Sequence, residues 1–327
     1  MSSDPDLVAA SDVILSVVPP CDALATAQRI LSAALSSSPS DPDGTAGGNT
    51  GTRPLYFADM NAVSPASVKT VAALFTSPTS PPTTRQIHFI DGSILGGPPK
   101  PPSQSRTQPT SDNNNDEEEE GPAYKQWTRP LLPTSGPTPL PLHLSQVLNI
   151  RHIAPEIGQA SALKMCFASL SKGFSAVAIE SITTAARYGV LSHLQSALLE
   201  VSGQASLTRL EKAVTSVAPK AYRWVREMEE ISATHSGSGG IDEEEEEMFS
   251  PEHIFRGAAD VFRTLAEDTA LGREKIGKRQ RGTTVEDVAE AVLEGLRERN
   301  LESKKRRRTE PEPETREGQE EKGGEGK

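Results

Sequence analysis

The sequence is poor in cysteine and in aromatic residues, and it has no long uninterrupted apolar run. Its 327 residues include two cysteines and 4% aromatic residues. Cys21 and Cys166 form neither a CxxC pair nor a metal-ligand pattern, so we expect reduced thiols and no metal site. No apolar run approaches the roughly 18 residues of a membrane span. Because Asp4 and Asp6 stand where a secretory signal would be basic, we expect a cytoplasmic protein without a membrane partner.

Apolar residues are also few, at 35% of the chain, and the net charge is −11. The low apolar content indicates that a sizeable part of the chain is disordered. A phosphate-binding surface needs a concentrated basic patch, so a nucleic-acid partner is not expected. Pro-, Gly-, Ser- or acid-rich text predicts flexible inserts near residues 36–53 and 98–123, an acidic loop at 234–247 and a charged tail at 301–327.

The first part of the chain alternates short apolar runs with helical patterns. Strands are predicted at residues 12–18, 55–58 and 87–90, with another near TRPLLPTSGP, and helices at 22–35 and 65–75. This alternation is typical of a parallel sheet with helical crossovers, in which ligands bind beyond the carboxyl ends of the strands. Pro19, Asn61 and Ser93 stand at those ends.

A long helix is predicted from residue 157 to residue 190, starting near Gly158. Apolar residues recur there at three- and four-residue steps, which predicts one buried face: Leu163, Phe167, Leu170, Phe174, Ala178, Ile182 and Ala185. Lys164 lies on the neighbouring face among small residues, near the positive end of the helix dipole. It is either a functional lysine or a solvent-facing one whose stem covers its neighbours.

The rest of the chain predicts an all-helical region. Amphipathic patterns cover residues 191–201, 207–217, 222–231, 251–270 and 285–299. The basic run Lys304 to Arg308 resembles a nuclear-import signal, but a solvated tail has the same composition.

Several segments in order carry a family resemblance: SDVILSVVPP, YFADMNAVSP, FIDGSILGGPP and GQASALKM. They resemble the β-hydroxyacid dehydrogenases related to 6-phosphogluconate and 3-hydroxyisobutyrate dehydrogenase. The onward text KMCFASLSKG is most similar to the branch with a 6-phosphogluconate-dehydrogenase-like C-terminal domain. The resemblance implies an incomplete Rossmann-like α/β domain at residues 1–145 and an all-α domain at 146–300.

The resemblance also implies a site. Lys164 matches the family's general acid/base for hydride transfer between a small hydroxyacid and NAD or NADP. The cofactor side would include Pro19, Pro20, Asn61 and Ser64, although Asn61 and Ser64 are also in place to cap a helix. Ser93, Gly96 and Gly97 would lie at the substrate, with the glycines alternatively serving a tight turn.

The sequence departs from the family in three places. Leu95 stands where a serine is expected, Phe167 and Ala168 occupy the positions of the family's asparagine, and no GxGxxG occurs to hold a pyrophosphate. The alternative is therefore a non-catalytic dimerisation or ligand-binding relative. Helical domains of this family commonly form the dimer interface, so a homodimer is expected, with apolar faces at Leu194, Leu198 and Leu210 available for it or for the core.

Overall fold

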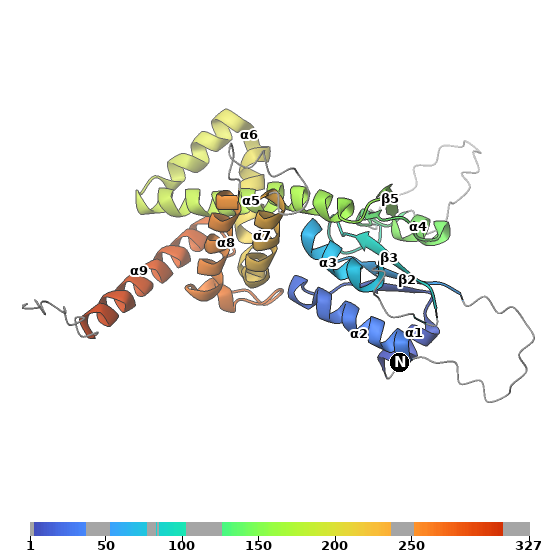
Figure 1. Ribbon diagram of the computed structural model, residues 1–327. Helices are drawn as coiled ribbons and strands as arrows, with labels where there is room; N and C mark the ends of the chain where they lie inside the picture. Colours follow the sequence, from blue (N-terminus) through green and yellow to red (C-terminus); the bar gives the residue numbers. More distant parts are fainter. Residues whose placement is uncertain are drawn as a thin grey trace, which may run out of the picture.

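The computed structural model describes residues 3–36, 53–76, 83, 85–102, 126–236 and 252–309. A five-stranded sheet flanked by helices comes first, and a helical region follows it (Figure 1). The predicted fold class, an α/β part followed by an all-α part, is therefore confirmed. The predicted inserts and the acidic loop lie mostly outside the described residues, although helix α7 continues through Thr234 to His235.

The sheet has the strand order β1-β2-β3-β4-β5. Its strands are β1 Val13–Ser16, β2 Leu55–Asp59, β3 Ile87–Gly92, β4 Leu132–Ser135 and β5 Ile150–Ala154. The first three strands are parallel, as predicted, but β4 runs antiparallel to β3 because the chain returns beside it through a Leu95–Leu131 bridge. The prediction of an all-parallel sheet was wrong in this respect. β5, which the sequence analysis did not find, lies beyond the expected domain end at residue 145.

Four helices belong to the sheet: α1 Asp4–Ala10, α2 Ala23–Ser36, α3 Pro65–Thr76 and α4 Leu142–Leu148. Helices α2 and α3 were predicted, whereas α1 and α4 were not. Buried residues of α1, α2 and α3 pack with Phe57 and Phe89 in one apolar cluster. The ring of Phe75 lies 5.1 Å from that of Phe57, so three of the chain's few aromatic residues stabilise this layer together.

Helix α5, Gln159–Arg187, is 29 residues long and runs from the sheet into the helical region (Figure 1). Its position confirms the predicted long helix. The predicted buried face holds in its second half, where Ala178, Ile182 and Ala185 are buried. The first half was wrong: the small-residue face is the buried one, while Leu163, Phe167 and Leu170 are 40%, 50% and 74% exposed.

By length and composition alone, α5 is long and apolar enough to cross a membrane, with a mean hydropathy of 1.3 over its best 18-residue window. Buried core helices meet the same criterion. Here α5 packs against strands β3, β4 and β5 and against the helices of the C-terminal region, which is the arrangement of a central scaffold helix.

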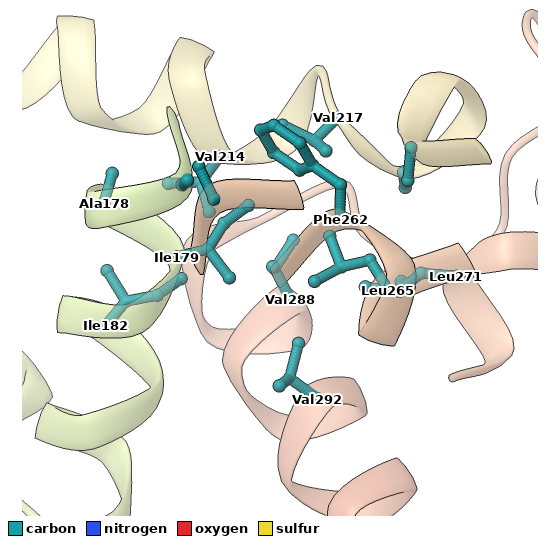
Figure 2. Close-up of a cluster of buried hydrophobic side chains, with 14 of the residues drawn as sticks. Ala178, Ile179, Ile182, Val214, Val217, Phe262, Leu265, Leu271, Val288 and Val292 are labelled. Carbon is teal, nitrogen blue, oxygen red and sulfur yellow. The ribbon is translucent and has the colours of Figure 1, made fainter. Parts of the chain in front are cut away.

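The helical region consists of α6 Leu191–Thr215, α7 Ala221–His235, α8 Glu252–Glu267 and α9 Val285–Thr309. Two helices predicted at 191–201 and 207–217 are joined as α6, with a kink at Gly203, whose φ is 78°. Side chains from α5, α6, α8 and α9 converge on one core that includes Phe262 and Leu265 (Figure 2). Helix α9 continues through Lys304 and the arginines after it, so the prediction of a wholly disordered tail from residue 301 was wrong.

Gly295 in α9 generates a stability prediction. A Cβ there would lie 2.1 Å from the carbonyl oxygen of Asp268, so Gly295→Ala forces α9 away from its neighbour. Gly257 in α8 has no atom within 4 Å of such a Cβ, so Gly257→Ala gains helix propensity of about 0.5–1 kcal/mol. In urea unfolding, Gly295→Ala should lower the free energy of unfolding and Gly257→Ala should raise it. If both variants had a higher free energy of unfolding than the parent chain, the close approach of Gly295 to Asp268 would be contradicted.

Candidate functional site

The amino-terminal end of α5 is fixed by the buried carboxylate of Asp91, at the carboxyl end of β3. Its Oδ2 accepts hydrogen bonds from the backbone N–H groups of Gly158, at 2.8 Å, Ala160, at 3.1 Å, and Ser161, at 3.2 Å. The hydroxyl of Ser161 donates to its Oδ1 at 2.6 Å, and that of Ser135 in β4 donates to its Oδ2 at 2.8 Å. One side chain thus satisfies backbone donors that a helix start leaves unpaired.

The charge of Asp91 suits this position, because a helix N-terminus favours an anion. Burial raises the pKa of the Asp91 carboxyl, and the hydrogen bonds from Ser161, Ser135 and Gly158 oppose that shift. The sequence analysis did not select Asp91. Its signal was a carboxylate near the end of a mostly apolar strand, directly before Gly92 and Ser93.

Lys164, the predicted catalytic residue, lies one turn into α5 and reaches back to the loop after β3. Its Nζ donates to the carbonyl oxygen of Ile94 at 2.5 Å. Burial lowers the pKa of the Lys164 ammonium. The solvent-facing alternative therefore does not describe this lysine, which lies at the junction between the sheet and α5.

The predicted substrate residues all belong to this loop, but they differ in access. The hydroxyl of Ser93 is buried and donates to the carbonyl of Ala160 at 3.2 Å, so it ties the loop to α5. Leu95 exchanges backbone hydrogen bonds with Leu131. Gly96 and Gly97 are exposed, and Gly96 has a φ of 118°, which favours glycine. The structure thus brings Lys164 and Ser93 together at one junction, with the glycines at the exposed end of the loop.

The predicted cofactor residues Pro19 and Asn61 gather at the carboxyl ends of β1 and β2. Asn61 is buried; its Oδ1 accepts from the backbone N–H of Val18 at 2.7 Å, and its Nδ2 donates to the Ser16 hydroxyl at 3.2 Å. Asn61 therefore joins the two strand ends. Pro19 is exposed and Pro20 opens a 3-10 turn, Pro20–Asp22, directly beyond β1.

Ser64, another predicted cofactor residue, lies at the start of α3. Its hydroxyl accepts from the backbone N–H of Ser67 at 3.2 Å and so caps α3. Its own backbone N–H donates to Glu230 Oε2 at 2.9 Å, and the Ser67 hydroxyl donates to the same oxygen at 2.9 Å. Glu230 comes from α7, and Arg226 donates to its other oxygen at 2.7 Å. This buried carboxylate, which sequence reasoning missed, joins the helical region to the sheet.

A second lysine on α5, Lys172, was also missed. Burial, together with the charges of Lys164 and Arg223, lowers the pKa of Lys172 to about 7, and the Lys172 ammonium donates to the carboxylate of Glu227. Its spacing from Lys164 gave a signal, because residues eight apart lie near one another on a helix surface.

Within the described ranges, no group of three or more His, Cys, Asp or Glu side chains is placed to hold a metal ion.

Asp59 generates a pH prediction. It is 1% exposed, its Oδ2 has no hydrogen-bond partner among the described residues, and burial raises its pKa to about 6 from 3.8, with Asp91 adding to the shift. Because the folded state holds this proton more tightly, the stabilisation is present below pH 4 and is lost as the pH rises through 6. Two units of pKa correspond to about 3 kcal/mol.

Asp59→Asn should therefore raise the free energy of unfolding by about 1–3 kcal/mol at pH 7.5 and flatten its pH dependence between pH 4 and 6.5. The asparagine oxygen still accepts the bond from the Asn61 backbone, which the aspartate accepts at 2.9 Å. Urea unfolding at pH 4.5 and at pH 7.5 measures both free energies, and Asp260→Asn, at an exposed position, is the control. The raised pKa would be contradicted if the gain in free energy of unfolding of Asp59→Asn over the parent chain were smaller at pH 7.5 than at pH 4.5.

The chain is similar to known proteins in part of its sequence and in its fold. The family described as "Domain of unknown function (DUF1932)" matches residues 185–265, from the end of α5 into α8. A search of curated protein sequences finds no match. A conserved hypothetical protein from Sinorhizobium meliloti 1021 has 17% identity and a TM-score of 0.51, with coverage of 91% of this chain and 78% of that one.

A second solved structure is the Mycobacterium tuberculosis 3-hydroxyisobutyrate dehydrogenase with L-serine. It has 16% identity and a TM-score of 0.50, and the match covers 91% of this chain and 83% of that chain. At such identities the likeness concerns the fold. This chain therefore has the two-domain fold of the 3-hydroxyisobutyrate dehydrogenase-like β-hydroxyacid dehydrogenases, and residues 185–265 match DUF1932.

Proposed function

We propose that this chain is an NAD(P)-dependent oxidoreductase of the β-hydroxyacid dehydrogenase type that acts on a small hydroxyacid. The observation that carries the proposal is the placement of Lys164. A lysine with a pKa lowered by burial projects from the start of α5 onto the Ile94 carbonyl, in the loop that the resemblance assigns to the substrate. The fold shared with a 3-hydroxyisobutyrate dehydrogenase supports the same reaction class.

Lys164 would move the proton in this reaction. Oxidation of a carbinol needs a base that takes the hydroxyl proton as hydride leaves, and a lowered pKa favours the neutral form of a lysine, which can accept that proton. The Ile94 carbonyl holds the Nζ at the loop until substrate replaces that hydrogen bond. A bound nicotinamide ring would supply the hydride acceptor.

The remaining predicted residues would bind and orient. The exposed Gly96 and Gly97 leave backbone N–H groups accessible to the carboxylate of a hydroxyacid. The strand ends joined by Asn61, next to Pro19 and Pro20, form the edge at which open α/β sheets bind ligands, so the cofactor residues present fit a nicotinamide there. Ser64 would act through the start of α3, which it caps.

Replacing Lys164 tests the reaction. Lys164→Ala should abolish turnover of a small hydroxyacid with NAD or NADP and leave cofactor affinity within about twofold, because the lysine moves a proton and does not hold the cofactor. Turnover is followed by nicotinamide absorbance and binding by calorimetry. The exposed Lys278→Ala, remote in sequence from the site, is the control. Unchanged turnover in Lys164→Ala would refute its role.

The second candidate function, a non-catalytic homodimerisation module, rests on the exposed stripe of α5. Leu163, Phe167, Leu170 and Val177 follow one another at steps of four, three and seven residues, which fit the a/d positions of a heptad repeat, and all four are at least 40% exposed. A second copy of α5 presents the same stripe, so a twofold pairing would bury both. Leu210, an alternative interface residue in the sequence analysis, is buried in the core instead.

Leu170→Asp should dissociate such a dimer, because a carboxylate in the centre of the stripe cannot be desolvated without a partner. Sedimentation equilibrium at micromolar concentration measures the mass. Leu301→Asp in α9, at a position 59% exposed, is the matched control and should leave the mass unchanged. A parent chain that sediments as a monomer would rule the pairing out.

A further inference from the structure

A basic cleft lies in the helical region, between α5, α6 and the start of α7. Its volume is about 700 Å³, within the range of small-ligand pockets. Three cationic side chains line it: Lys172 from α5, and Arg209 and Lys212 from α6. The rest of the wall includes the hydroxyl groups of Ser171, Ser175, Thr208 and Ser216 and the aromatic rings of Phe174 and Trp224. Among the residues that the structure describes, the lining offers many hydrogen-bond donors and no carboxylate.

Two of these cations, Arg209 and Lys212, lie at the rim of the cleft on exposed positions of α6. Among the described residues, neither Arg209 nor Lys212 forms an ion pair. The guanidinium of Arg209 lies over the ring of Phe174, with Cζ 4.3 Å from the ring centroid, which holds it at the cleft wall. Arg209 and Lys212 are three residues apart on one helix, where like charges repel. Within the described part of a chain of net charge −11, these two adjacent cations therefore have no carboxylate partner.

Lys172 forms the inner end of the cleft. Its side chain is 12% exposed, it donates to Glu227, and its Nζ lies 5.6 Å from the centroid of the Trp224 ring. Burial and the positive charges of Lys164 and Arg223 destabilise its ammonium form, as the lowered pKa shows. An anion in the cleft would relieve this repulsion.

The dipole of α6 does not account for the cluster. Lys212 lies in the last turn of α6, where a cation interacts favourably with the helix C-terminus. That interaction extends over one turn and involves neither Arg209 on Phe174 nor Lys172 on another helix. Three cations from two helices around one cavity require a different explanation.

We propose that this cleft binds a small organic phosphate, with Lys172, Arg209 and Lys212 around the phosphate group and Trp224 and Phe174 against its apolar part. A phosphate monoester carries close to two negative charges and several acceptor oxygens, which match one guanidinium, two ammonium groups and the hydroxyls of the wall. A monocarboxylate would leave most of these donors unpaired. The two aromatic rings favour a ligand with a flat or apolar substituent.

The cleft is separate from the proposed dehydrogenase site. Lys164 does not line it, and eight residues of helix place Lys172 about 12 Å further along α5. A small hydroxyacid at Lys164 would not reach that far. The proposed phosphate site therefore does not depend on the oxidoreductase assignment.

Fluorescence of Trp224 gives a direct test. The chain has two tryptophans, so Trp127→Phe leaves Trp224 as the reporter in an otherwise intact 327-residue chain. Phenyl phosphate should change its emission with saturable binding at millimolar concentration or tighter, and benzoate should bind at least tenfold more weakly because it lacks the second charge. Binding should weaken as salt is added.

Variants then locate the site. Arg209→Gln and Lys212→Gln, both at exposed positions, should each weaken phenyl phosphate binding roughly tenfold. Lys172→Met combined with Glu227→Gln, which leaves no unpaired buried carboxylate, should weaken it further. Arg297→Gln on α9 makes the same change of net charge elsewhere and should have no effect. Absence of saturable binding, equal binding of benzoate, or affinity that survives all three cleft variants would overturn the proposal.

Discussion

The structure depends on one buried carboxylate at the start of α5. Asp91, the residue before the last in β3, accepts hydrogen bonds from three backbone N–H groups of the loop and first turn of α5 and from the hydroxyls of Ser135 and Ser161. These bonds fix where the helix begins and in which direction it leaves the sheet. Since Lys164 lies one turn further on, its reach to the Ile94 carbonyl follows from the same anchor. A buried anion at a helix N-terminus is expensive to desolvate, and here the helix dipole and five donors offset that cost.

A second buried carboxylate fixes the other contact between the two parts of the molecule. Glu230 of α7 accepts from Ser64 and Ser67 at the start of α3 and is paired with Arg226. Both joints therefore have the same design, in which an acidic side chain from one element satisfies the unpaired donors at the start of a helix in another. Through these joints the ends of β1, β2 and β3 face the helical region at a defined separation. The predicted cofactor and substrate residues lie at that boundary.

Charge is distributed unevenly along α5. Its start is held by an anion, its first half carries two lysines of lowered pKa, and its exposed stripe is apolar. Such a helix serves three surroundings at once: the sheet, the helical core and whatever covers the stripe. Its small residues explain how it can do so, because Ala160, Ala168 and Ala176 allow neighbouring elements to approach closely while longer side chains point elsewhere.

Local periodicity and strand-ending residues in the sequence were enough to determine β1, β2, β3, α2, α3, the length of α5 and the helical character of the remainder. The strand pattern placed Asn61 and Ser93 beyond the strand ends, and the resemblance assigned Lys164, Ser93 and Asn61 to one site. The tertiary structure alone decided the antiparallel entry of β4, the hydrogen-bond duties of Asp91 and Glu230, and the burial of the alanine face of α5 in place of its leucines. The reason is that periodicity identifies which residues share a face, whereas burial depends on which neighbour arrives there. Leu170 and Ala168 are both compatible with a core, and the close approach of the packed helices selected the smaller side chain.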